Sequence, residues 1–280
     1  ARVCWCTAVA DVVAGEHSTF TLHLPPKPDL PPNWQRPPKV CVQVLRENRK
    51  HAPGAPPQVE FSASQQLVRT APTMRLRYGP IHTAGPYLLA VTIDGAHVAG
   101  SPFLLTCRPA PPVGELSSFD NKQVGVRAGE VAVLLITTRD RYDNKCTYGG
   151  ARVSVHDASP EADADRLAHS LQDPPSGLSP AERVVYHEMM LDAGEAIEVT
   201  DRRDGTYEAR VLLMRAGTRR LIGCVHGVPF DSGALVLVVS AAALHAPSCV
   251  AHGDALECFV VAGMPSYLKL RARDAYGNAC

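Results

Sequence analysis

The chain has 280 residues, which is room for about two ordinary domains. Its 28 basic and 28 acidic residues cancel, and no basic run is long enough to follow a nucleic-acid backbone or an anionic membrane. No apolar stretch reaches the roughly 20 residues of a membrane span, and the hydrophobic content of 45% is typical of a globular protein.

An alanine-glycine pair opens three similar stretches. They read AGEHSTFTLHL from Ala14, AGEVAVLLITTRDRYDNKC from Ala128 and AGMPSYLKLRARDAYGNAC from Ala262, so the starts are 114 and then 134 residues apart. Spacings of this size indicate repetition of whole domains. We therefore predict one domain over 1–110, a second over 111–243 and the start of a third, cut short, over 244–280. The chain is expected to be a piece of a longer array.

Short alternating or β-branched runs bounded by turn residues predict strands, and helical periodicity is nearly absent. The first repeat is predicted to have strands near Ser18–Leu24, Val40–Leu45, Val59–Ala63, Met74–Tyr78, Tyr87–Ile93 and Phe103–Cys107, with a hairpin turn at Asp94-Gly95. The proline-dense run at 25–38 cannot donate ladder hydrogen bonds. It predicts an extended loop, or alternatively a polyproline ligand.

The second repeat gives the same kind of pattern with an insertion over 157–195. Its strands are predicted near Val131–Thr137, Ala151–His156, Ala196–Thr200, Tyr207–Met214, Arg219–Cys224 and Ala234–Ser240. Inside the insertion, Ser179-Pro180-Ala181-Glu182 forms a capping box, which predicts a short helix over about 180–190. Many closely spaced strands predict an all-β protein of tandem antiparallel sandwiches, the second of them carrying this short helical insertion.

Residues that could carry chemistry are scattered. His187-Glu188 lacks the second histidine of a zinc-protease helix, and Cys4-Trp5-Cys6 has no second close pair to complete a metal site. Asp143 and Asn144 supply too few oxygens for calcium and are interpreted as turn-capping residues. There is no phosphate-binding loop and no nucleophile elbow in the sequence. We expect no catalytic residues, no metal and no cofactor, so the segment is predicted not to be an enzyme.

The motifs of both repeats resemble those of filamin-type immunoglobulin-like repeats. The closing part of such a repeat is similar to Gly85-Pro86-Tyr87, the strand after it and Gly100-Ser101-Pro102-Phe103 in the first repeat. The second repeat has a less complete match, in Asp204-Gly205-Thr206-Tyr207 and Gly227-Val228-Pro229-Phe230. Arg139 to Asn144 and Arg273 to Asn278 resemble the polar turn after the family's second strand. The first repeat lacks that turn, and the insertion is foreign to the family's pattern.

The resemblance implies a non-catalytic scaffold whose partners add a strand beside the third strand of each sandwich. The edges would be Val40–Leu45 and Ala151–His156, and the insertion follows the second edge, where its apolar face either covers that edge or docks a neighbouring protein. Deleting 157–195 would separate these two roles. The residues expected to contact partners are Val40, Val42, Val44, Val59, Phe61, Val153, Val155, Val185 and Met189.

Two cellular settings fit the resemblance, and the nine cysteines bear on the choice. Only Cys146 and Cys280 occupy equivalent positions, and no cysteine pair recurs between repeats, which favours reduced thiols and a cytoplasmic, cytoskeletal or ciliary scaffold. The alternative is a cell-surface adhesion protein of the gamete-surface type. Asn144-Lys145-Cys146 and Asn278-Ala279-Cys280 fit the rarer glycosylation motif Asn-x-Cys, and a Cys41–Cys107 disulfide would also indicate the surface.

Overall fold

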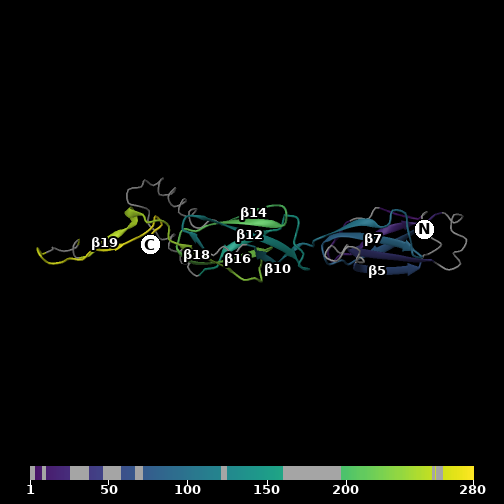
Figure 1. Cartoon of the computed structure of the whole chain (residues 1–280), viewed down its shortest axis with the longest axis horizontal. Coiled ribbons are helices and arrows are strands. Elements are labelled where there is room, and N and C mark those ends of the chain that lie inside the picture. The colour runs from purple at the N-terminus through teal and green to yellow at the C-terminus, as the bar shows by residue number, and fades with distance from the viewer. Residues whose placement is uncertain are drawn as a thin grey trace, which may run out of the picture. The chain divides into compact units, whose positions relative to one another are not determined.

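The structure is a computed structural model that describes residues 4–7, 11–25, 38–46, 58–66, 72–120, 125–159, 197–253, 256 and 261–280. The chain forms two compact units. Unit 1 comprises residues 1–111 and 139–147, and unit 2 comprises residues 112–138 and 148–280. Each unit is a sandwich of β-sheets, so the predicted all-β immunoglobulin-like fold is confirmed (Figure 1).

Unit 1 packs a three-stranded sheet against a larger one. The first sheet has the order β1-β3-β6, from β1 (Trp5–Cys6), β3 (Ser18–His23) and β6 (Thr73–Tyr78). The second has the order β2-β9-β7-β4-β5, from β2 (Val12–Val13), β9 (Phe103–Arg108), β7 (Gly85–Ile93), β4 (Lys39–Arg46) and β5 (Gln58–Gln66), with β8 (Ala96–His97) added to β7. Asp94 and Gly95 both have positive φ, as a tight hairpin between β7 and β8 requires.

Unit 2 repeats this arrangement. One sheet has the order β10-β12-β15-β14, from β10 (Pro112–Phe119), β12 (Val131–Asp140), β15 (Thr206–Leu212) and β14 (Ile197–Asp201). The other has the order β11-β18-β16-β13, from β11 (Gly125–Arg127), β18 (Leu235–Ser240), β16 (Gly217–Val225) and β13 (Val153–Asp157), with β17 (Val228–Pro229) added to β16. In both units a short strand near the alanine-glycine pair runs parallel to the last strand.

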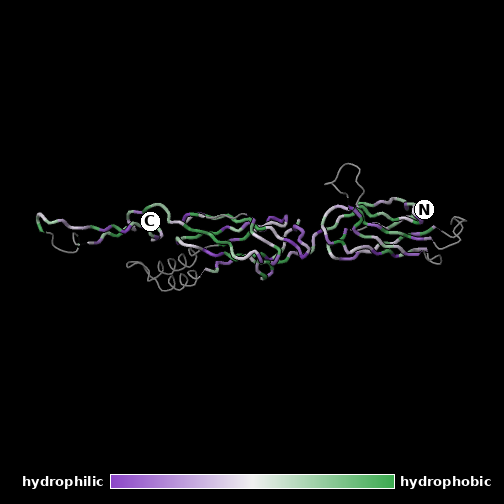
Figure 2. The backbone as a smooth tube through the Cα atoms, turned by 60° about the horizontal axis from the view of Figure 1, so that its bottom comes forward, coloured by the Kyte–Doolittle hydropathy of each residue, from purple (hydrophilic) through white to green (hydrophobic). Residues whose placement is uncertain are grey.

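Alternation along the strands builds a separate core in each unit. In β6, Met74, Leu76 and Tyr78 are buried while the residues between them are exposed, as expected for a sheet with one face on the core. The core of unit 1 also contains Phe20 and Leu89, and that of unit 2 is built in the same way from strands β12, β15, β16 and β18. Hydrophobic residues accordingly recur along the strands of each unit (Figure 2).

The last part of the chain forms a 3-10 turn at Ala246–Ser248 and a two-stranded ladder of β19 (Val250–His252) with β20 (Lys269–Arg271). This part of the chain leaves apolar side chains such as Leu268 and Leu270 exposed, whereas the residues at the same places of the second alanine-glycine stretch, Leu134 and Ile136, are fully buried. The domain limits at 110 and 243 stay predictions.

Two sequence predictions lie outside the described residues: the helix at about 180–190, with its face of Val185 and Met189, and nearly all of the proline-dense loop. Within the described part of the chain, no helix is long and apolar enough to cross a bilayer.

Candidate functional site: two turn clasps and a sheet edge

The polar turn after β12 is held by one carboxylate. Asp140 Oδ1 accepts the backbone N–H groups of Tyr142 and Asn144, each at 2.9 Å. Its Oδ2 accepts the N–H of Ala110 and the Nδ2 of Asn144, each at 2.8 Å. Asp140 is fully buried, so these four donors replace the water that the carboxylate loses.

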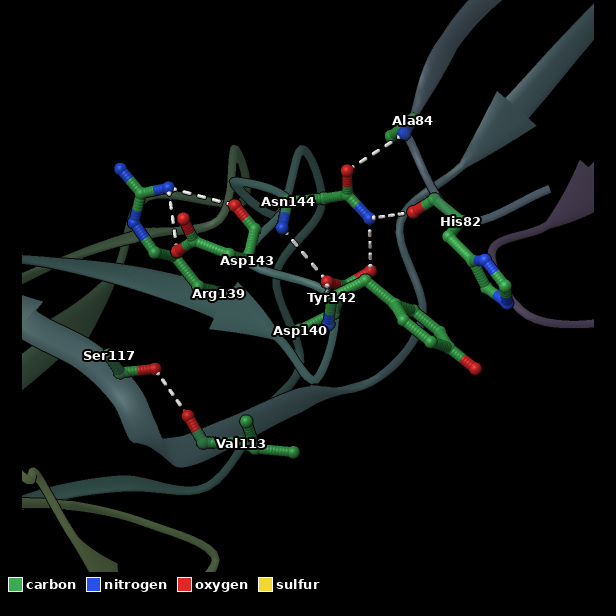
Figure 3. A network of polar contacts seen from close by, with 9 residues as sticks. All are labelled: His82, Ala84, Val113, Ser117, Arg139, Asp140, Tyr142, Asp143 and Asn144. Carbon is green, nitrogen blue, oxygen red and sulfur yellow. Dashed lines mark hydrogen bonds and ion pairs between the residues drawn. The ribbon is translucent and has the colours of Figure 1, made fainter. Parts of the chain in front are cut away.

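Asn144 extends this turn to the loop between β6 and β7. Its Nδ2 donates to the carbonyl of His82 at 2.7 Å, and its Oδ1 accepts the N–H of Ala84 at 2.8 Å (Figure 3). The bond to Asp140 occupies the second hydrogen of Nδ2, so the amide is fully engaged. An aspartate at this position could not donate to the His82 carbonyl.

Tyr142 completes the contact through its ring. The ring lies against His82, with centroids 4.7 Å apart, and packs on the core of unit 1. A Cβ atom on Gly15 would lie 1.9 Å from the Tyr142 hydroxyl, and Gly15 has a φ of 82°. Glycine is therefore required here for both the backbone conformation and the space under the tyrosine. We call the turn residues Asp140, Tyr142 and Asn144, together with the surface that receives them, clasp 1. That surface, which we call the acceptor of the turn, is formed by Gly15, His82, Ala84 and Ala110, and the whole clasp belongs to unit 1.

Unit 2 contains the same assembly, which we call clasp 2. Its turn residues are Asp274, Tyr276 and Asn278, and its acceptor residues are Gly129, Met214, Ala216 and Ala242. Asn278 Nδ2 donates to the Met214 carbonyl at 2.9 Å and its Oδ1 accepts the Ala216 N–H at 2.8 Å. Asp274 Oδ2 accepts the Ala242 N–H at 2.9 Å, and a Cβ on Gly129 would lie 2.1 Å from the Tyr276 hydroxyl. The two clasps thus match bond for bond.

Burial and hydrogen bonding act in opposite directions on Asp274. Burial acts to raise the pKa of its carboxyl, but the bonds from the Asn278 side chain and from the N–H groups of Ala242, Asn278 and Tyr276 outweigh it and hold the pKa below its ordinary value. The carboxylate therefore stays charged throughout the physiological range.

The sheet edges differ between the units. The prediction that Val40–Leu45 forms an open edge is wrong, because β4 lies between β7 and β5 and pairs with both. Val40, Val42 and Val44 point into the core at 3% exposure or less. On β5, Phe61 packs on the core, whereas the Val59 side chain is exposed.

In unit 2 the equivalent strand, β13, is the edge of its sheet among the described residues. Its pairing with β16 is antiparallel, and the bonds His226 N–H to Arg152 C=O and Ala158 N–H to Arg220 C=O fix the register. Hydrogen-bonded and non-hydrogen-bonded positions alternate in such a ladder. The backbone groups of Val153, Val155 and Asp157 therefore face away from β16, while the Val155 side chain lies in the core.

A buried ion pair lies at the end of β13. Arg219 Nη1 is 3.4 Å from Asp157 Oδ2, and the two side chains are 1% and 5% exposed. Ser159 donates from both its N–H and its hydroxyl to the other carboxylate oxygen, at 2.9 and 2.5 Å. The matching registers of the two sheets place Val44 and Tyr87 of unit 1 at the positions of Asp157 and Arg219.

The cysteines of the described segments are free thiols. Cys41 and Cys107 cannot form the disulfide considered above, because they lie on opposite faces of the sheet, with β7 between their strands. Burial raises the pKa of Cys107 to about 11. Burial and the neighbouring Cys4 raise that of Cys6 to about 12, and Cys4 and Cys6 both pack on the core.

The sequence places Asp140, Tyr142 and Asn144 in a polar turn and Gly15 in an alanine-glycine pair, but it does not predict that this turn contacts Gly15, His82, Ala84 and Ala110. The signal was present, because Asp-x-Tyr-x-Asn follows the second and third alanine-glycine pairs at the same distance. Each turn covers the glycine of an earlier alanine-glycine stretch, Gly15 under Tyr142 and Gly129 under Tyr276, and this long-range pairing leaves no local pattern in the sequence.

Comparison with solved structures shows the immunoglobulin-like sandwich fold. The chain superposes on the Escherichia coli adhesin FdeC with a TM-score of 0.54 at 15% identity, covering 99% of this chain and 74% of that one. It superposes on InvD of Yersinia pseudotuberculosis with a TM-score of 0.51 at 14% identity, covering 97% and 69%. No protein-family model and no curated protein matches the sequence.

Proposed function

We propose that this chain is a non-catalytic segment of a cell-surface adhesion protein, in which tandem sandwiches act as spacers and interaction modules. The observation that carries the proposal is the repetition of one sandwich with one clasp, because the residues that recur between units serve folding and none forms a reaction centre. The fold likeness to the adhesin FdeC extends over nearly the whole chain and supports the surface setting over the cytoplasmic one.

The partner surface in this proposal is the β13 edge. Its outward N–H and C=O groups are those that a partner strand would pair with. The side chains on the face away from the core, Ser154 and His156, would supply the polar contacts that select the partner. Unit 1 offers no such position on β4, because β5 already fills it. The proposal therefore places partner binding on Val153 and Val155, while Val40, Val42 and Val44 serve the core.

The test uses Val153→Pro, which removes one outward N–H without breaking a bond to β16. The control is Val153→Thr, which keeps the N–H. Beads coated with the wild-type chain and the control are expected to adhere to partner cells, and beads coated with the proline variant are expected to lose most of this adhesion. Equal adhesion of all three would refute the role of the edge, and no adhesion by any would refute the adhesion function.

A filamin-type scaffold in a cytoskeletal or ciliary assembly is the second candidate. One observation favours it: in the stretch Gly100-Ser101-Pro102-Phe103, the Ser101 hydroxyl accepts the Val91 N–H at 2.9 Å, so this filamin-like motif ties the end of the hairpin to β7. Antibody labelling of intact and permeabilised cells separates the candidates. Labelling of intact cells supports the surface protein, and labelling only after permeabilisation supports the scaffold.

A further inference from the structure

The acceptor of each clasp recognises three side chains of the turn: an amide, an aromatic ring and a carboxylate. In unit 1 the carbonyl of His82 and the N–H of Ala84 together require a side chain that both donates and accepts. The bare α-carbon of Gly15 leaves space for an aromatic ring. The N–H of Ala110 donates to a carboxylate oxygen.

The carbonyl, the N–H groups and the α-carbon that receive the turn belong to the backbone. This explains why the two acceptors match although their side chains differ. His82 in unit 1 is replaced by Met214 in unit 2, yet the carbonyl at that position accepts the same amide in both. Recognition therefore depends on the sequence Asp-x-Tyr-x-Asn and on the shape of the acceptor, which are the requirements of a peptide-binding site.

We infer that the clasp acceptor is a binding site for Asp-x-Tyr-x-Asn turns, and that a second copy of this chain can supply the turn. In the intact chain the tethered turn has a high effective concentration and occupies its own acceptor. A chain whose own turn is lost has a vacant acceptor. A chain whose acceptor is blocked has a free turn, and the two are complementary.

The first experiment vacates the acceptor in the full chain with Asp140→Ala/Tyr142→Ala/Asn144→Ala. A synthetic peptide of residues 139–147 is then added at millimolar concentration, and amide exchange at Ala84 and Ala110 is followed by NMR. We expect the peptide to slow exchange at both amides at least about tenfold, because bound amides exchange only when the complex opens. The peptide of residues 273–280 should do the same.

The control peptide carries Tyr142→Ala and Asn144→Ala, and Ala216 in clasp 2 is the internal reference that should stay protected throughout. Equal protection by the control peptide, or no protection by either native peptide, would overturn the inference. If the triple variant does not fold, the native peptide added during refolding must restore the native fluorescence of unit 1, and failure to do so also overturns it.

The second experiment tests the second copy directly. Gly15→Val blocks the acceptor of one chain, since its side chain would overlap the Tyr142 ring, and leaves that chain's turn free. Light scattering is expected to show monomers of each variant alone and a heterodimer when this variant is mixed with the triple variant. A mixture that stays monomeric would rule out exchange between copies, even if the peptide binds.

Discussion

The buried ion pair of unit 2 should be replaceable by the apolar pair that occupies the same positions in unit 1. Asp157→Val alone leaves the Arg219 guanidinium buried at 1% exposure without its carboxylate. Loss of one partner from a buried pair costs about 3–5 kcal/mol. Asp157→Val/Arg219→Tyr removes both charges and installs the residues found at Val44 and Tyr87, so it should recover most of this loss and fall short of the wild type only by the two bonds that Ser159 donates to Asp157.

The sequence provides a convenient assay, because it has no tryptophan after residue 111, and Trp5 of unit 1 stacks on His23 with ring centroids 3.8 Å apart. Tryptophan fluorescence therefore reports unit 1 as an internal control, while far-UV circular dichroism and calorimetry also report unit 2. For a unit of this size, 1 kcal/mol corresponds to roughly 2–4 °C in Tm, so the single variant should lower the Tm of unit 2 by roughly 6–20 °C.

Two results would refute this reasoning. A single variant as stable as the wild type would show that water reaches the Arg219 charge. A double variant as unstable as the single one would show that the packing around these positions differs between the sandwiches.

Three further predictions concern the clasps and the thiols. Gly15→Ala should destabilise unit 1 by several kcal/mol in urea titrations followed by tryptophan fluorescence, whereas Gly95→Ala, with a φ of 81° and open space around it, should cost only about 1 kcal/mol of backbone strain; equal losses would contradict the tyrosine contact. The lowered pKa of Asp274 means that its stabilisation is complete above about pH 4 and is lost as pH falls through the folded-state pKa, so Asp274→Asn should flatten the acid dependence of unit 2 measured by circular dichroism. Iodoacetamide should modify Cys41 in the native chain and spare Cys107, as peptide mass analysis would show; rapid modification of Cys107 would contradict its burial.

The sequence predicts the strands well because alternation and turn residues are local signals. The strand over Met74–Tyr78 was found within one residue of its observed start, and the Asp94-Gly95 turn was found in place. Short strands such as β2 and β11 were missed, because two or three residues carry no periodicity and their pairing depends on the last strand of the sandwich.

The site was harder to predict because its parts are far apart in sequence. The edge over Val40–Leu45 was misplaced because the same alternation fits an inner strand and an edge strand, and only the pairing of β5 distinguishes them. The ion pair was not predicted either, since neither Asp157 nor Arg219 interrupts a recognisable strand pattern. Long-range contacts of this kind follow from the fold and leave no local pattern.

The full engagement of the Asn144 amide bears on how the chain would behave in the secretory pathway. Oligosaccharyltransferase modifies the asparagine nitrogen, and in the folded protein both hydrogens of that nitrogen are bonded, to His82 and to Asp140. A sugar there would have to be attached before the turn closes and would keep it from closing. Glycan occupancy at Asn144, and equally at Asn278, would thus measure the fraction of chains that were modified before this turn folded. It would not show that the asparagine is exposed in the folded protein.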